Sequence, residues 1–392
     1  MDKHLVCFAG NDWWVHNPMT EKQWMRILAR RGWTVLFVNS IGVGMPGLDS
    51  PRVFRRVLRK LTSMARFLRR DENVWVLTPV LLPFWSVSVV RTLNQFLLAL
   101  QLRWSMKRAG MGTALFWAGL PTAASMLRRI PHREVLYYVQ DNYTAYYDSM
   151  TFSRIAEDHE RMLQEADAVI CASIGLHERI AATRGQVWYI PHGVHDVFLD
   201  APLRTNESPD DLRDIPHPII GYWGSLEGLQ DLVLIRALAG RHPEWQFVFI
   251  GRPMLDLSAL AALPHVHFLG PKSQQELPRY AAHFDVAWMS FVQSEWIRYS
   301  CPVKLREYLA MGLPVVSPPI IEVERAFPGE CATAATVDEF SQCIAEALAT
   351  DSPEARMRRR ALVREQRWSD TATSVETVLR NLRGDQRDGG RN

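Results

Sequence analysis

Two charged side chains in the C-terminal half of the chain share one face of a predicted helix. Lys304 and Glu307 are three residues apart, so they are neighbours on a helix surface. Pro302 suits the first turn, where its missing N–H costs nothing, and Gly312 suits the left-handed position after the last turn. A helix N-terminus attracts anions, and a carboxylate accepts hydrogen bonds from a diol. The pattern predicts a site for a ligand carrying both groups; an ordinary helix with solvated charges is the alternative.

The run that contains these residues resembles a known family signature. Lys304 to Val316, Lys-Leu-Arg-Glu-Tyr-Leu-Ala-Met-Gly-Leu-Pro-Val-Val, is similar to the donor site of GT-B glycosyltransferases, which transfer sugars from nucleotide diphosphates. The resemblance implies that Glu307 grips the ribose hydroxyls and that Lys304 faces the diphosphate or the sugar. It is strongest over residues 217–318. In the first half, the segment 78–94 resembles bacterial polysaccharide and teichuronic-acid-type transferases.

Composition limits the classes of protein to consider. A chain of 392 residues with 47% hydrophobic residues is long enough for two domains. Five cysteines are an odd number without metal-like spacing, which favours a reducing cytoplasm and argues against a zinc site. The N-terminal apolar run is too short for a signal peptide, and no apolar run is long enough for a transmembrane helix.

Strand-like and helix-like segments alternate along the whole chain, which predicts α/β domains with parallel sheets. The predicted strands are 5–9, 34–38, 74–77, 114–117, 135–139, 168–172, 187–190, 219–223, 247–250, 266–269 and 314–317. The resemblance implies a GT-B fold, in which two Rossmann-like domains face a cleft and a C-terminal helix crosses back to the first. The expected parts are an acceptor-binding domain (1–198), a linker (199–216), a nucleotide-sugar-binding domain (217–368) and a C-terminal helix and tail (369–392).

Further donor-site residues are expected where loops follow the strands of the second half. A glycine at Gly224 lets backbone amides approach a diphosphate, and the N-terminus of a helix beginning near Leu229 favours the charge. The resemblance adds the loops after later strands, which hold the nucleobase, and the Pro-His-Gly-Val turn at 191–194. The predicted donor-binding set is Gly224, Ser225, Arg252, Lys272, Ser300, Lys304, Glu307 and His192.

Acceptor-side residues are expected in the first half, at the carboxyl ends of its strands. The loop 10–17 offers Trp13 and Asn17, although its aromatic rings can equally pack on a neighbouring loop. Asp141 follows the 135–139 strand and resembles the general base of the inverting glucuronosyltransferases of xanthan assembly; capping a helix near Tyr143 is its alternative role. Many retaining GT-B enzymes have a glutamate where this chain has Tyr299. Inversion is therefore favoured, and retention stays open.

Residues 51–70 form a distinct basic segment. It carries eight Arg and Lys residues and no acidic residue, with apolar residues at helical spacing. Such a helix can lie in an anionic membrane interface, and a surface helix with a solvated basic face is the equal alternative. A recognised nucleic-acid-binding motif does not accompany it, so nucleic acid is not an expected partner.

Together these features predict a cytoplasmic, peripherally membrane-associated glycosyltransferase in bacterial surface polysaccharide assembly. Its donor is a nucleotide-diphosphate sugar and its acceptor a glycan or a lipid-linked glycan. Amides near Gly224, the helix N-terminus at Pro302 and Lys304 would balance the diphosphate charge, so neither a metal nor a cofactor is expected. A sugar-nucleotide epimerase and a binding protein without turnover are the alternatives.

Overall fold

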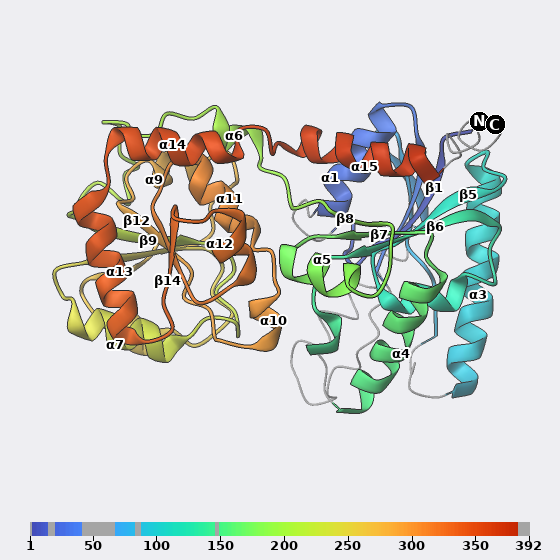
Figure 1. Ribbon diagram of the computed structural model, residues 1–392, viewed down its shortest axis with the longest axis horizontal. Coiled ribbons are helices and arrows are strands. Elements are labelled where there is room, and N and C mark those ends of the chain that lie inside the picture. Colours follow the sequence, from blue (N-terminus) through green and yellow to red (C-terminus); the bar gives the residue numbers. More distant parts are fainter. Residues whose placement is uncertain (1, 15–19, 41–66, 83–87, 146–148, 383–392) are drawn as a thin grey trace. The chain divides into compact units, whose positions relative to one another are not determined.

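The computed structural model describes residues 2–14, 20–40, 67–82, 88–145 and 149–382 (Figure 1). The chain divides into two compact units. Unit 1 comprises 1–172, 179–190 and 371–392, and unit 2 comprises 173–178 and 191–370. Each unit contains its own sheet.

Unit 1 is built on an eight-stranded sheet whose strands are parallel except for one antiparallel edge strand. Its central strands are almost completely buried on both sides, as expected for parallel strands covered by helices on both faces. In spatial order the strands are β3 (Leu68–Asp71), β4 (Val74–Leu77), β2 (Thr34–Val38), β1 (His4–Phe8), β5 (Ala114–Ala118), β6 (His132–Val139), β7 (Ala168–Cys171) and β8 (Val187–Tyr189).

Helices cover both faces of this sheet (Figure 1). On one face lie α1 (Thr20–Arg30) and the C-terminal helix α15 (Trp368–Leu382), and on the other lie α3 (Ser88–Arg108) and α4 (Ser149–Glu165). The helix α5 (Ile174–Ala181) is divided between the two units. Two 3-10 helices, η1 (Pro121–Met126) and η2 (Tyr143–Ala145), follow β5 and β6.

Polar contacts tie the C-terminal helix α15 to unit 1. Trp24 donates its indole N–H to the Thr371 hydroxyl at 2.9 Å, and Trp33 donates to the Glu376 carboxylate at 3.1 Å. Lys3 and Arg31 form ion pairs with the same carboxylate. The chain therefore returns to its first unit after completing the second.

Unit 2 is built on a six-stranded parallel sheet. In spatial order its strands are β11 (Val266–Phe268), β10 (Gln246–Ile250), β9 (Ile219–Trp223), β12 (Val286–Trp288), β13 (Val315–Ser317) and β14 (Cys331–Thr333). Its helices are α6 (Asp196–Leu199), α7 (Leu232–Arg241), α8 (Ser258–Ala261), α9 (Leu277–Ala281), α10 (Glu295–Arg298), α11 (Val303–Ala310), α12 (Ile321–Ala326), α13 (Val337–Thr350) and α14 (Pro353–Val363). Helices α7 and α13 pack together on one face, whereas α11 packs against α14 on the other (Figure 1).

The predicted alternation of strands and helices is confirmed, and the predicted basic helix over 51–70 is wrong at its end. Leu68–Asp71 forms β3, an antiparallel edge strand paired with β4, in which the exposed Arg69 and Arg70 lie. Basic side chains suit an edge strand because they discourage pairing with another chain. Residues 51–66 lie outside the described residues.

Two further features bear on the sequence-based predictions. All five cysteines are free thiols. Within the described ranges, no helix combines the length and hydropathy needed to span a bilayer.

Candidate functional site

The helix α11 has the ends that the sequence predicts. Pro302 occupies the residue before its first turn, and Gly312 follows its last turn with a φ of +67°. No side chain caps its N-terminus, so its first amides stay available to a ligand, as in anion sites at helix N-termini. Lys304 and Glu307 extend from this helix towards the carboxyl end of β9, where both meet residues 222–224.

Aromatic rings surround the Lys304 side chain. Its ammonium lies 5.4 Å from the ring centre of Tyr222 and 5.7 Å from that of Phe291. The Gly224 backbone leaves room for the chain, because a Cβ there would lie 2.1 Å from Lys304 Cε. The cation is held over the rings, and none of the described residues forms an ion pair with it. An anionic ligand is therefore the complementary partner.

Replacing Gly224 by alanine is expected to displace Lys304. The new methyl group would overlap Lys304 Cε, and the φ of +139° already disfavours any side chain there. Loss of one charged hydrogen bond, worth about 1.5–3 kcal/mol, would weaken nucleotide-diphosphate binding roughly tenfold or more in calorimetry. Gly228 is the matched control, because a Cβ there meets nothing within 4 Å. Equal affinity of the two alanine variants would contradict this role for Gly224.

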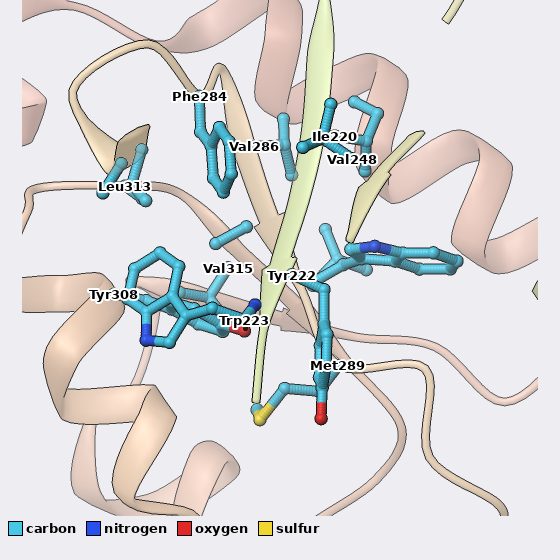
Figure 2. Packing of buried hydrophobic residues seen from close by; sticks show 14 of the residues in the cluster. Ile220, Tyr222, Trp223, Val248, Phe284, Val286, Met289, Tyr308, Leu313 and Val315 are labelled. Atoms are coloured by element: carbon cyan, nitrogen blue, oxygen red, sulfur yellow. Dashed lines mark hydrogen bonds between the residues drawn. The ribbon is translucent and has the colours of Figure 1, made fainter. Parts of the chain in front are cut away.

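The carboxylate of Glu307 is nearly buried and is oriented by Trp223, a residue that the sequence analysis did not single out. The indole N–H of Trp223 donates to Glu307 Oε2 at 2.8 Å. The Trp223 ring is itself fixed, stacked on Phe198 and in edge contact with Tyr308 at 4.3 Å between ring centres. Figure 2 shows the Trp223 and Tyr308 rings side by side. Burial raises the pKa of Glu307, while the Trp223 hydrogen bond, the Lys304 charge and a hydrogen bond from Gln274 oppose that rise.

Two predicted features of the Gly224 loop are wrong. The Gly224 amide is not available to a diphosphate, because it donates to the Ile250 carbonyl at 2.9 Å and so extends the β9–β10 ladder. The following helix α7 begins at Leu232 rather than near Leu229, and its N-terminus is not open either. The Asp231 carboxylate caps it by accepting from two of its first amides. A second anion at that end would be repelled by this carboxylate.

In the part of the chain that the structure describes, no hydrogen bond or ion pair joins the other predicted donor-binding residues in the loops to Lys304 or Glu307. Ser225 and Arg252 are exposed, and within the described residues neither side chain has a hydrogen-bond partner. Lys272 is held by the Asp211 carboxylate at 2.5 Å, which with Tyr280 raises its pKa. The Ser300 hydroxyl donates to the Ile297 carbonyl at 2.8 Å, within the segment that leads into α11. These four residues therefore stay predictions as ligand contacts.

His192 lies in a buried polar cluster behind α11. Burial and the neighbouring Arg306 charge lower its pKa to about 3, so its imidazole is neutral. Arg306 and Glu322 form an ion pair at 2.6 Å with side chains 1% and 0% exposed. Arg306 also contacts the Cys301 sulfur at 3.2 Å. This pair, which the sequence analysis missed, anchors the start of α11, and a buried His192 gives no evidence of ligand contact.

Asp141 follows the carboxyl end of β6 in unit 1 and is partly buried. Burial raises the pKa of its carboxyl from 3.8 to about 6. The helix-capping alternative is not supported, because Tyr143 N–H donates to the Asp141 backbone carbonyl rather than to its side chain. The raised pKa fits a proton acceptor.

A second carboxylate near this edge of the sheet, Glu21 of α1, was not predicted. It is 1% exposed and accepts from the Gly10 amide and the Trp117 indole, each at 2.9 Å. Burial raises its pKa to about 7, and these two hydrogen bonds oppose the rise. A Cβ on Gly119 would lie 1.9 Å from Glu21 Oε1. Glu21 thus joins the loops after β1 and β5, and it contributes with Asp141 to the acidic environment of Tyr143.

The predicted acceptor residues of the first loop are not supported by the described structure. Trp13 is 1% exposed and packs on Phe37 at 4.8 Å between ring centres, with its indole N–H bonded to Asp71 at 2.7 Å. A ring buried in this way cannot stack on a sugar, so the packing alternative describes it. Asn17 lies outside the described residues.

Comparison with known proteins supports the donor-site resemblance. Residues 217–350 match the family described as Glycosyl transferases group 1. A protein of Bacillus subtilis (strain 168) named as a teichuronic acid biosynthesis glycosyltransferase, TuaH, is 30% identical over 166 residues and is a homologue. The match covers 40% of this chain and 41% of that relative, so it spans about two fifths of either protein.

Solved structures share the architecture over nearly the whole chain. Sucrose-phosphate synthase from Thermosynechococcus elongatus matches with a TM-score of 0.69 and 15% identity, covering 97% of this chain and 98% of that one. HepE of Anabaena, solved with UDP and glucose, matches with a TM-score of 0.64 and 16% identity, covering 97% and 100%. These likenesses show the fold. The chain has the GT-B fold, and its residues 217–350 match the family described as Glycosyl transferases group 1.

Proposed function

We propose that this protein transfers a sugar from a nucleotide-diphosphate donor to a glycan or lipid-linked acceptor in bacterial surface polysaccharide assembly. The group 1 domain supports the transferase class, and the homologue's name supports the polysaccharide setting. HepE was solved with UDP and glucose, which supports a nucleotide sugar as donor. A cytoplasmic enzyme at the inner face of the cytoplasmic membrane fits such an acceptor.

The arrangement of Lys304 and Glu307 on α11 carries this proposal. Lys304 and the first amides of α11 supply positive charge for the diphosphate. Glu307, held by Trp223, would accept from the ribose hydroxyls. A nucleoside diphosphate carries both groups, a diphosphate and a ribose diol. The leaving group would thus be neutralised by the chain itself, so we expect transfer without a metal ion or another cofactor.

Asp141 is proposed as the general base of an inverting reaction. Its carboxylate would take the proton of the acceptor hydroxyl while the acceptor oxygen attacks the anomeric carbon opposite the leaving diphosphate. With a pKa of about 6, it is mostly ionised at neutral pH yet basic enough to accept a proton. Glu21 is too enclosed by Gly10 and Trp117 to meet an acceptor, so its proposed role is to hold the loops.

The fate of a labelled donor tests this function. The full chain would be incubated, with and without EDTA, with a panel of nucleotide-diphosphate sugars labelled in the sugar. We expect slow hydrolysis to the nucleotide diphosphate for the matching donor, equal in EDTA because Lys304 and the α11 amides carry the charge.

Two other results would contradict the proposal. Conversion to an epimeric sugar nucleotide would indicate an epimerase, and an intact donor despite binding would indicate a sensor. If hydrolysis is lost in EDTA and restored by a divalent cation, the proposal of a transferase stands, but the expectation that it needs no metal ion is wrong.

A further inference from the structure

The helix α3 of unit 1 has two apolar faces. One face is buried and packs into the unit through Asn94, Leu98, Ala99, Leu102, Ser105 and Met106. On the opposite face a stripe of large apolar side chains is exposed. The stripe recurs at intervals of four, three, four and four residues, which places its members on one line along the helix. Its members and their exposed fractions are Val89 74%, Leu93 44%, Phe96 55%, Leu100 47% and Trp104 52%.

A loop adds two more exposed apolar residues beside this helix. Gln101 of α3 donates to the Val80 carbonyl and accepts from its amide, both at 2.8 Å. Asn94 holds Leu82 in the same way, at 2.8 and 2.9 Å. Val80 and Leu82 are 41% and 43% exposed. The loop is therefore fixed to α3, and the apolar surface is already formed in the folded chain. We call it the α3 face.

Exposure of this extent requires an explanation. The solvent side of a helix in a water-soluble unit is normally polar, and a row of exposed large apolar residues marks a contact surface. Among the exposed large hydrophobic residues of the described chain, seven belong to the α3 face and four lie elsewhere, at Val233, Met254, Met357 and Leu362. The surface is thus concentrated in one place on unit 1.

The charge around the α3 face is entirely positive along the sequence. Residues 73–133 contain no Asp or Glu, but they contain seven Arg and Lys residues. Four of these belong to α3 itself: Arg91, Arg103, Lys107 and Arg108. Two others lie beside it, because Arg103 donates to the Arg129 carbonyl at 3.0 Å and Arg128 precedes that residue. The acidic groups that face these cations come from α4: Glu165 lies 4.0 Å from Arg128, whose side chain is 82% exposed, and Asp158 interacts with Arg91. In an anionic lipid surface, the apolar stripe matches the acyl chains and the bordering cations match the charged headgroups.

The basic segment 51–66 joins the described chain at this surface. Phe67, the first described residue after it, lies 5.6 Å from Trp104 between ring centres. The segment carries six Arg and Lys residues and no acidic residue, so its charge matches the same anionic partner.

We propose that the α3 face docks the protein on an anionic bilayer, with α3 lying along the interface. The apolar stripe would enter the headgroup and acyl boundary while the neighbouring cations contact lipid phosphates. This inference deepens the proposed function, since it names the surface that would bring the enzyme to a lipid-linked acceptor. Because lipid binding does not depend on turnover, the membrane-docking proposal and the proposed function can be contradicted separately.

Vesicle sedimentation tests the α3 face with the full chain. Phosphatidylcholine vesicles with and without phosphatidylglycerol serve as probes. The double variant Phe96→Gln, Leu100→Gln removes two exposed apolar side chains without touching the buried face. Its matched control is Val233→Gln, Met357→Gln in unit 2, where both side chains are also exposed. Thermal unfolding and donor hydrolysis are measured for every variant.

The expected result is strong binding of the natural protein and of the control only to vesicles that contain phosphatidylglycerol. The α3 variant should bind them at least tenfold more weakly, with its unfolding temperature and donor hydrolysis unchanged. Added salt should weaken binding of the natural protein. Equal binding by the α3 variant would overturn the proposal, as would equal binding of the natural protein to neutral and anionic vesicles. If the natural protein self-associates but does not bind vesicles, and the α3 variant loses this self-association, the α3 face is instead a contact with a second copy of the chain.

Discussion

Replacing Asp141 by asparagine is expected to lower turnover by roughly two orders of magnitude or more. Asparagine keeps the size and polarity of the side chain but cannot accept the acceptor proton. Because size and polarity are kept, the fold should tolerate the change. Calorimetry with the nucleotide diphosphate should give the natural affinity, because Lys304 and Glu307 are untouched.

The pH dependence of the natural enzyme belongs to the same prediction. Burial raises the pKa of Asp141 to about 6, so the base is protonated below that pH and ionised above it. The rate should therefore rise with pH through about 6 and then level off, and the asparagine variant should lack this limb. Asp158→Asn is the matched control for this pH limb. Burial also raises the pKa of Asp158 to about 6, but Asp158 lies within the helix α4. Near-natural turnover in Asp141→Asn would remove Asp141 from the mechanism and favour retention.

Replacing Glu307 by alanine is expected to weaken nucleotide-diphosphate binding at least tenfold. The carboxylate would lose its hydrogen bonds to the ribose hydroxyls, each worth about 1.5–3 kcal/mol for a charged acceptor, and about 1.4 kcal/mol is tenfold in affinity. The change also leaves the Trp223 indole without its acceptor. Calorimetry on the folded variant measures the effect.

Two further variants separate ribose binding from local packing. Glu307→Gln keeps an acceptor for Trp223 and should bind with intermediate affinity, because only the charge is lost. Glu324→Ala, an exposed glutamate on α12, should bind like the natural protein. An affinity unchanged in Glu307→Ala would show that this carboxylate does not hold the ribose.

Local sequence was sufficient wherever one short segment contained all the necessary signals. The strands 34–38, 74–77 and 219–223 match β2, β4 and β9 residue for residue, since each is a mostly apolar run followed directly by a polar residue or a glycine. The helix α11 was equally well marked, with Pro302 before it and the positive φ of Gly312 after it. Such features need no partner from elsewhere in the chain.

Features that depend on distant partners were missed or misjudged. Glu21 is buried by contacts with Trp117, 96 residues away, and Trp13 is buried against Asp71, 58 residues away. The strand β3 has only four residues, two of them arginine, so its alternation was indistinguishable from the end of a basic helix. The availability of the Gly224 amide was set by its bond to Ile250 in the neighbouring strand. Tertiary contacts decided each of these cases.

Sugar transfer with Asp141 as base is tested most directly by the configuration of the product at its anomeric carbon. The natural protein would be given its donor in EDTA with methanol as a simple acceptor, and the methyl glycoside would be identified by proton NMR, since a glycoside does not equilibrate between its two forms. Inversion predicts a glycoside of configuration opposite to that of the donor, absent in Asp141→Asn. A glycoside of the same configuration, formed equally by both proteins, would contradict the assignment.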